Sequence, residues 1–153
     1  MSRIGGGRVP GRGLAAAATG NCAAVSASTD LGTLTDFFDR YGVALTAGDL
    51  PALAGCYALP GLVVSDTYSF AFSTPAAVTL SFVGAAPDYQ ERELIAAHAL
   101  IEDVQQVSAL VTMVAVEWEF LDSSGGRVPG ERYRYLLRAT ETGPLICTVV
   151  RVG

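Results

Sequence analysis

The stretch that decides the fold is residues 39–50, which read DRYGVALTAGDL. Its apolar side chains continue a spacing of three and four residues that starts upstream, and this spacing predicts a helix over Leu34–Thr46. Thr33 is suited to cap the start of that helix. One face of the helix carries Leu34, Phe37, Phe38, Tyr41 and Leu45. The stretch therefore predicts an amphipathic helix that packs against a core.

The end of the same stretch predicts a sharp turn into a second helix. Gly48 can adopt the left-handed conformation that commonly ends helices. Asp49 follows directly and can cap the next helix, which would bury Leu50, Leu53 and Tyr57. Two helices are therefore expected to meet at a tight corner.

Short strands and a third helix are predicted next along the chain. Strands are expected over Leu62–Ser65 and Tyr68–Phe72, around a turn near Asp66. Proline is favoured at the first position of a helix, so a helix is expected to begin at Pro75. Its apolar side chains are Val78, Leu80, Phe82 and Val83.

Four long strands make up the second half of the chain. They are predicted over Leu94–Gln105, Ala109–Leu121, Arg132–Ala139 and Leu145–Val152. In a strand, alternate side chains face opposite sides of the sheet. The hairpin between the second and third strands would then place Glu117 and Glu119 beside Arg132 and Arg134 on the outer face. The aromatic side chains of these strands would point inward, toward the helices.

Helices followed by strands predict an α+β fold, with about three N-terminal helices on one face of a curved antiparallel or mixed sheet. Residues 39–50 resemble the aromatic-x-x-Ala-Leu-x-Ala-Gly-Asp-x opening of SnoaL-like and ketosteroid-isomerase-like members of the nuclear transport factor 2-like (NTF2-like) superfamily. Val116–Leu121 and Tyr133–Arg138 are similar to strands of that superfamily. The resemblance runs from about Thr33 to the last residue. It implies a cone-shaped, cystatin-like roll closed as a conical barrel, a pocket between sheet and helices, and frequent dimerisation, but no single activity.

The resemblance to ketosteroid isomerase also points to site positions. That enzyme uses a tyrosine on its first helix, an aspartate base after the second, and a protonated aspartate on a late strand. These positions fall here on Tyr41, on Ser65 with Asp66 one residue further, and on Tyr135. Because the base position and the second donor position do not hold aspartate, we expect no appreciable ketosteroid isomerase activity.

The candidates for proton transfer are Tyr41, Asp66 and His98. Each also has an ordinary structural role. Tyr41 lies on the buried helix face, where it can simply pack in the core. Asp66 lies in a turn, where aspartate is common for backbone reasons. His98 is the only histidine and can titrate near neutral pH, but a histidine in an apolar strand is often a core residue.

Aromatic side chains can line a pocket for a small, flat, mainly apolar molecule. Equally, they can fill the interior of the cone. Neither a metal nor a cofactor is expected, because the single histidine has no carboxylate partners at ligand spacing and the three cysteines lack C-x-x-C spacing. The aromatic residues concerned are Tyr57, Tyr68, Phe72, Trp118, Tyr133 and Tyr135.

Composition excludes several classes of partner. The chain has 153 residues, of which 50% are hydrophobic, and its net charge is −5 with the basic residues scattered. This pattern gives no electrostatic footprint for nucleic acid or for an anionic membrane. No apolar run reaches the roughly 18 residues that span a bilayer. A cytoplasmic protein with reduced thiols is the expectation.

Residues 1–28 are expected to form a disordered N-terminal extension to a single domain over residues 29–153. They show no sustained periodicity. Three arginines precede the alanine-rich segment Leu14–Ala18 and loosely resemble a signal peptide, although the apolar region is weak. A disordered extension, or a start codon assigned too early, fits this composition better.

Two functions remain after these exclusions. The leading hypothesis is a SnoaL-like small-molecule-pocket protein, with isomerase, cyclase or dehydratase reactions as the proton-transfer chemistry considered. The alternative is a non-catalytic dimeric ligand-binding or assembly module. A homodimer is expected to form through an apolar patch on the outer sheet face, made of Val111, Met113, Ala115, Leu136, Cys147 and Val149.

Overall fold

The computed structural model describes residues 29–153 except 84–88 and 90. The extension expected over residues 1–28 lies outside the described residues. Within the described part, helices precede a six-stranded sheet, apart from one short helix that follows the first two strands. The fold is therefore α+β, as the sequence predicts.

Helix α2 spans Leu31–Ala47 and buries the apolar face that its spacing predicts. It begins three residues earlier than expected. Asp30, rather than Thr33, is the cap, and its Oδ1 atom accepts a hydrogen bond of 2.7 Å from the backbone nitrogen of Thr33. The first turn is exposed and carries only one large apolar residue, Leu31, so the hydrophobic spacing could not locate the start.

Gly48 ends helix α2 with a φ of 67°, as predicted. Asp49 then caps helix α3 (Leu50–Ala54), its Oδ1 accepting from the backbone nitrogen of Ala52 at 3.2 Å. Tyr57 does not belong to this helix, because it is the first residue of strand β1 (Tyr57–Val64). A tyrosine four residues after Leu53 fits a helix face as well as the start of a buried strand, so spacing alone could not decide.

Helix α4 spans Pro75–Phe82 and confirms the third predicted helix. Thr74 caps it, with Oγ1 accepting from the backbone nitrogen of Ala77 at 3.2 Å. Only Val78 of this helix is fully buried, whereas the side chain of Leu80 is 72% exposed. Helix α4 therefore covers the core at its margin and leaves apolar surface uncovered.

The sheet is mixed and curved, in the order β2-β1-β6-β5-β4-β3. Strand β1 runs parallel to β6, and every other neighbouring pair is antiparallel. Because β2 and β3 remain as free edges, the sheet does not close into the barrel that the family resemblance implies. The remaining strands are β2 (Ser69–Phe72), β3 (Leu94–Gln106), β4 (Val111–Asp122), β5 (Arg127–Thr140) and β6 (Gly143–Val152).

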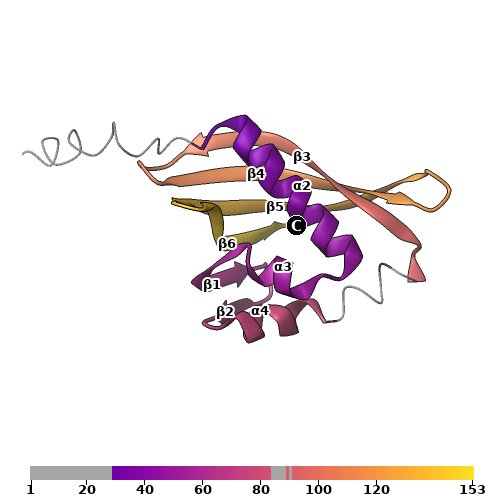
Figure 1. Ribbon diagram of the computed structural model, residues 1–153, viewed down its shortest axis with the longest axis horizontal. Helices are drawn as coiled ribbons and strands as arrows, with labels where there is room; N and C mark the ends of the chain where they lie inside the picture. The colour runs from indigo at the N-terminus through magenta and orange to yellow at the C-terminus, as the bar shows by residue number, and fades with distance from the viewer. Residues whose placement is uncertain (1–28, 84–88, 90) are drawn as a thin grey trace, which may run out of the picture.

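The core lies between the sheet and the helices. Helix α2 lies across the sheet, while α3 and α4 lie near β1 and β2 (Figure 1). Alternate side chains of β4, among them Val114, Val116 and Trp118, are buried beneath α2. The rings of Phe38 and Trp118 meet edge to face with centroids 6.3 Å apart. The predicted inward orientation of the aromatic face is thus confirmed.

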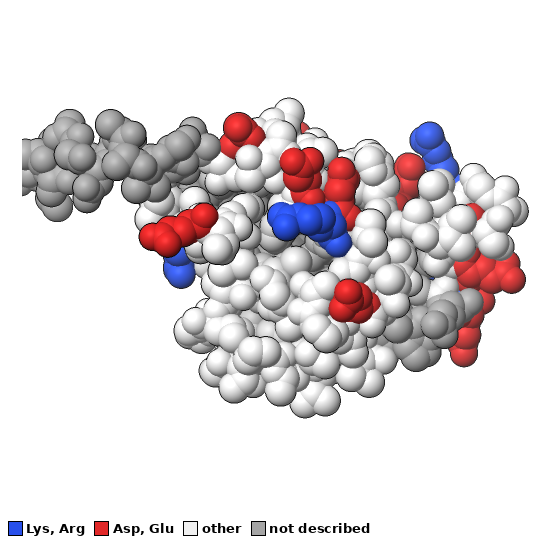
Figure 2. Space-filling model, in the orientation of Figure 1, with Lys and Arg blue, Asp and Glu red and all other residues white. Residues whose placement is uncertain are grey.

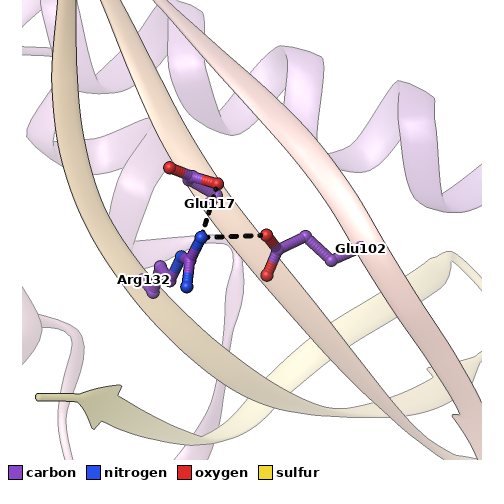
Figure 3. A network of polar contacts seen from close by, with 3 residues as sticks. All are labelled: Glu102, Glu117 and Arg132. Atoms are coloured by element: carbon purple, nitrogen blue, oxygen red, sulfur yellow. Dashed lines mark hydrogen bonds and ion pairs between the residues drawn. The ribbon is translucent and has the colours of Figure 1, made fainter.

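The opposite, outer face of the sheet carries ion pairs across three strands. In Figure 3 the helices lie behind the strands, and Arg132 of β5 reaches toward Glu117 and Glu102 on the two strands that follow on one side, β4 and β3. Its Nη2 atom lies 3.2 Å from Glu117 on β4 and 3.6 Å from Glu102 on β3. The predicted pairing of Glu117 with Arg132 is confirmed by the strand register.

A register irregularity changes the next pair. It falls between Glu117 and Glu119, so Glu119 forms its ion pair with Arg127 at 3.6 Å. Arg134 lies opposite Ala115 rather than opposite a glutamate. Arg134 beside Glu117 would need a register offset by two residues from the observed one, and alternation alone cannot tell these registers apart because both keep the same side chains on the outer face.

The predicted outer-face patch needs one correction as well. Val149 is buried in the core opposite Tyr135, not on the outer face. The register between β5 and β6 shifts by one residue at Cys147, because Leu136 pairs with Thr148 while Leu137 pairs with Ile146. An extra residue of this kind reverses the side to which the following side chains point.

Charge is unevenly distributed over the surface. Figure 2 shows few charged side chains over the part of the molecule where Figure 1 draws α4 and β2. Exposed apolar side chains in these two elements include Phe70 and Leu80. No helix among the described residues combines the length and apolar character needed to cross a membrane.

Candidate functional site

An open cavity of about 810 Å³ lies where α2 and α4 meet the β1, β2, β5 and β6 side of the sheet. Ligand pockets of small molecules commonly have 300–1,000 Å³. Most of the wall is apolar, and Arg151 is the one charged side chain among the described residues that line it. The apolar wall includes Val63, Phe70, Ala77, Leu80, Phe82 and Val149.

Four tyrosines supply polar groups to this cavity, and two of them form a buried pair. Tyr41 comes from the buried face of α2, and Tyr57 is the first residue of β1. Their hydroxyl oxygens are 2.7 Å apart and share a hydrogen bond. Only one of the two hydroxyl protons can lie in that bond. The second proton is therefore available to an acceptor placed in the cavity.

Burial fixes the protonation state of this pair. It raises the pKa of Tyr41 well above the usual range, with the neighbouring Tyr57 and Tyr135 adding to the effect. Burial likewise raises the pKa of Tyr57. Both hydroxyls therefore remain protonated at neutral pH. They can donate hydrogen bonds to a carbonyl or other acceptor, but they cannot serve as general bases.

The predicted aromatic pocket residues fall into three groups. Tyr68 and Tyr133 line the cavity together with Tyr57. Phe72 and Tyr135 are buried in the core, being 2% exposed each. Trp118 lines a smaller adjoining hollow of about 320 Å³ that shares Tyr41 and Tyr133 with the main cavity. Some of the predicted aromatic residues thus line a cavity, and the others fill the core.

Tyr135 occupies the position at which the resemblance places the late acidic residue. Its hydroxyl oxygen accepts a hydrogen bond of 2.8 Å from Nε1 of the Trp118 indole. Its ring packs on Phe38, with centroids 5.0 Å apart. Tyr135 is therefore held in the core beneath α2.

Asp66 and His98 are not brought together with Tyr41. Asp66 is exposed in the turn between β1 and β2, where Ser65 Oγ accepts hydrogen bonds from the backbone of Thr67 and Tyr68. It lines an adjoining hollow of about 500 Å³ that shares Tyr68 and Arg151 with the main cavity but does not include Tyr41. His98 is exposed on β3, opposite Glu119 of β4. Since Glu119 belongs to the outer face, His98 lies on the other side of the sheet from the cavity.

The sequence did not predict a connected set of polar side chains that lies at the edge of the cavity. Arg151 lines the cavity, and its Nη2 atom is 2.6 Å from Oε1 of Glu131. Glu131 also accepts a hydrogen bond from the hydroxyl of Tyr133. Burial raises the pKa of Tyr133, and the contact with Glu131 adds a smaller effect in the same direction. The sequence signal that could have found Glu131 is its spacing of two residues from Tyr133 and four from Tyr135, which puts all three side chains on the same face of the strand.

No cluster of three or more potential metal ligands of the His, Cys, Asp or Glu type occurs in the part of the chain that the structure describes. The described cysteines, Cys56 and Cys147, are free and half-buried. Burial raises the pKa of the Cys56 thiol. The polar chemistry of the cavity therefore rests on hydroxyl groups, one guanidinium and the nearby Glu131.

Comparison with protein-family models decides the family. Residues 32–153 match the model described as "NTF2-like protein (DUF6841)". The chain belongs to this NTF2-like family. The match covers both α2, with its Tyr41, and the last strand, with its Arg151. A comparison with curated proteins finds no significant match.

Solved structures of other NTF2-like proteins share the fold. An NTF2-like protein with a cystatin-like fold from Novosphingobium aromaticivorans has a TM-score of 0.62 at 15% identity, covering 87% of each chain. An NTF2-like protein of unknown function from Shewanella oneidensis has a TM-score of 0.60 at 14% identity, covering 78% of this chain and 96% of that chain. A ketosteroid isomerase-like protein from Erwinia carotovora atroseptica has a TM-score of 0.53 at 19% identity, covering 82% and 98% respectively. At these identities the likeness concerns the fold alone.

Proposed function

We propose that this NTF2-like protein binds a small, mainly apolar molecule in the tyrosine-lined cavity. The observation that carries the proposal is the Tyr41–Tyr57 pair, a spare hydroxyl donor at the wall of an otherwise apolar cavity of about 810 Å³. Apolar walls with a few well-placed polar groups are typical of small-molecule sites. The polar group that the tyrosines would bind is a hydrogen-bond acceptor, such as a carbonyl oxygen.

The proposal is tested by blocking the cavity without changing the rest of the surface. Ala77 lines the cavity from α4, and its neighbour Ala76 is exposed on the same helix. A ligand that binds only the native state raises the melting temperature. We therefore expect flat apolar compounds to raise the melting temperature of the wild-type protein and of Ala76→Trp, but not of Ala77→Trp. Equal shifts in the two variants would place binding elsewhere.

Proton-transfer catalysis is the second candidate, because one carboxylate lies close enough to be considered. Glu131 lines the smaller hollow together with Tyr41. A donor and a carboxylate around one space are the elements that isomerase, cyclase or dehydratase chemistry needs. The similarity in fold to the ketosteroid isomerase-like protein from Erwinia carotovora atroseptica makes this class worth testing. Asp66 lines an adjoining hollow that does not include Tyr41, so it has no part in this version of the site.

The two candidates differ in what happens to a bound ligand. A compound identified by thermal shift would be incubated with the protein and analysed by mass spectrometry and NMR. Conversion to an isomer or a dehydrated product that is lost in Glu131→Gln would support catalysis. Recovery of the unchanged compound would support a binding protein.

A further inference from the structure

The cavity has one charged side chain among the described residues that line it, and this is Arg151 near the end of β6. Its side chain is 48% exposed, so the guanidinium lies at the mouth of the cavity rather than at its base. The strand register places Arg151 directly opposite Tyr133 on β5, which lines the same cavity. A cation at the rim of an apolar cavity restricts which ligands the cavity favours.

Glu131 leaves most of the hydrogen-bonding capacity of the Arg151 guanidinium available. A guanidinium has five N–H donors. Among the described residues, its hydrogen bond is a single one from Nη2 to Glu131. Glu131 lines the two neighbouring hollows but not the main cavity. The ion pair therefore occupies one side of the guanidinium and leaves the cavity side to a ligand.

Glu131 carries one negative charge next to Arg151, so it competes with an anionic ligand for the guanidinium. Its carboxylate is shared with Tyr133, whose hydroxyl donates to the second oxygen. This bond leaves the formal charge of Glu131 unchanged, because the hydroxyl is neutral. A ligand with one carboxylate can use the guanidinium donors that Glu131 leaves open, whereas repulsion from Glu131 disfavours a ligand with two negative charges.

We propose that the ligand of this cavity is an apolar molecule that carries a single carboxylate, which binds the cavity side of Arg151 while the apolar body lies against α4 and the tyrosines. A planar guanidinium matches a carboxylate in both geometry and charge. This inference rests on the proposed function, because it names the ligand class of the same cavity. It assigns Arg151 as the residue that selects acids over their neutral analogues, and Glu131 as the group that weakens that selection.

The test compares matched acids and amides by isothermal titration calorimetry and thermal shift on the full chain. The probes are naphthoate and decanoate, each paired with its neutral primary amide. The variants are Arg151→Gln, Glu131→Gln and, as a control, Arg134→Gln, whose side chain is exposed on the outer face of β5. We expect the wild-type protein and the control to bind the acid about tenfold more tightly than the amide, the advantage of a charge-assisted hydrogen bond.

The two site variants should change this preference in opposite directions. Arg151→Gln should lose it while still binding the amide, and Glu131→Gln should increase it by removing the competing carboxylate. A gain of affinity in Glu131→Gln cannot come from misfolding, so the inference stays testable if Arg151→Gln is unstable. Equal binding of acid and amide by the wild-type protein would overturn the inference and leave the proposed function standing. Failure of both to bind would overturn the two together.

Discussion

At the scale of single residues, the Tyr41–Tyr57 pair links stability to ligand binding. The two hydroxyls satisfy each other in a buried site, 2.7 Å apart. Removing one partner leaves the other hydroxyl buried without its bond, which typically costs about 1–3 kcal/mol, whereas removing both can be nearly neutral. We expect Tyr41→Phe and Tyr57→Phe each to lower the free energy of unfolding by an amount in this range.

The double variant Tyr41→Phe/Tyr57→Phe tests whether the two hydroxyls depend on each other. Urea unfolding of the double variant should show a loss well below the sum of the two single losses, because neither hydroxyl remains to be satisfied. Additive losses would mean that the two hydroxyls do not depend on each other. The double variant should also lose affinity for carbonyl ligands, since the spare donor is gone.

The same residue scale shows how far the sequence could predict the site. Tyr41 could be placed on a buried face because helical spacing depends only on local order. Arg151 could not, because its place beside the cavity depends on the irregularity at Cys147, which shifts the register of β6. His98 was a candidate for its chemistry alone, and its position on β3 puts it on the outer face, opposite Glu119.

At the scale of elements, the packing of α2 on β3 requires a residue without a side chain. A Cβ atom at Gly42 would lie 2.6 Å from the backbone oxygen of Ala97 and 3.3 Å from Cζ3 of Trp118. The first contact is with backbone, which cannot move without separating helix from sheet. We expect Gly42→Ala to lower the free energy of unfolding by about 1–3 kcal/mol, the usual cost of overpacking.

Gly32 provides the matched control in the same helix. A Cβ atom there would have one neighbour, Oδ1 of Asp30, at an ordinary distance of 3.5 Å. Alanine is a better helix former than glycine, so Gly32→Ala should leave stability unchanged or raise it by up to about 1 kcal/mol. Both variants would be measured by urea unfolding. Similar stability of the two would show that α2 can move away from β3 at little cost.

Elements were predicted from the sequence where their signals are local. The cap Asp49, the left-handed Gly48 and Pro75 at the start of α4 each lie within a few residues of the helix end they mark. The parallel pairing of β1 with β6 joins residues about 85 apart in the chain, such as Leu62 and Thr148. No local pattern carries such a pairing, and this is why Tyr57 was assigned to a helix.

At the scale of the whole molecule, the helices are on one side of an open sheet and the other side is uncovered by the described elements (Figures 1 and 3). The Arg132 ion pairs balance charge on that outer face. Half-buried Met113 and Leu136 lie opposite each other at the centre of the sheet. A surface with an apolar centre and paired charges resembles the layout of protein interfaces.

We therefore expect two copies of the chain to associate through this outer face, by the predicted patch without the buried Val149, which leaves Val111, Met113, Ala115, Leu136 and Cys147. A stable interface usually buries about 800 Å² per partner, and a charge at its centre removes that association because it must be desolvated without a partner. Leu136→Glu should then sediment as a monomer at micromolar concentration, while the wild-type protein sediments as a dimer.

Val43→Glu is the control, since Val43 is 69% exposed on α2, on the opposite side of the sheet. It should remain dimeric, and circular dichroism should show both variants folded. A wild-type protein that sediments as a monomer, or a Val43→Glu variant that dissociates as readily as Leu136→Glu, would contradict the outer face as the interface.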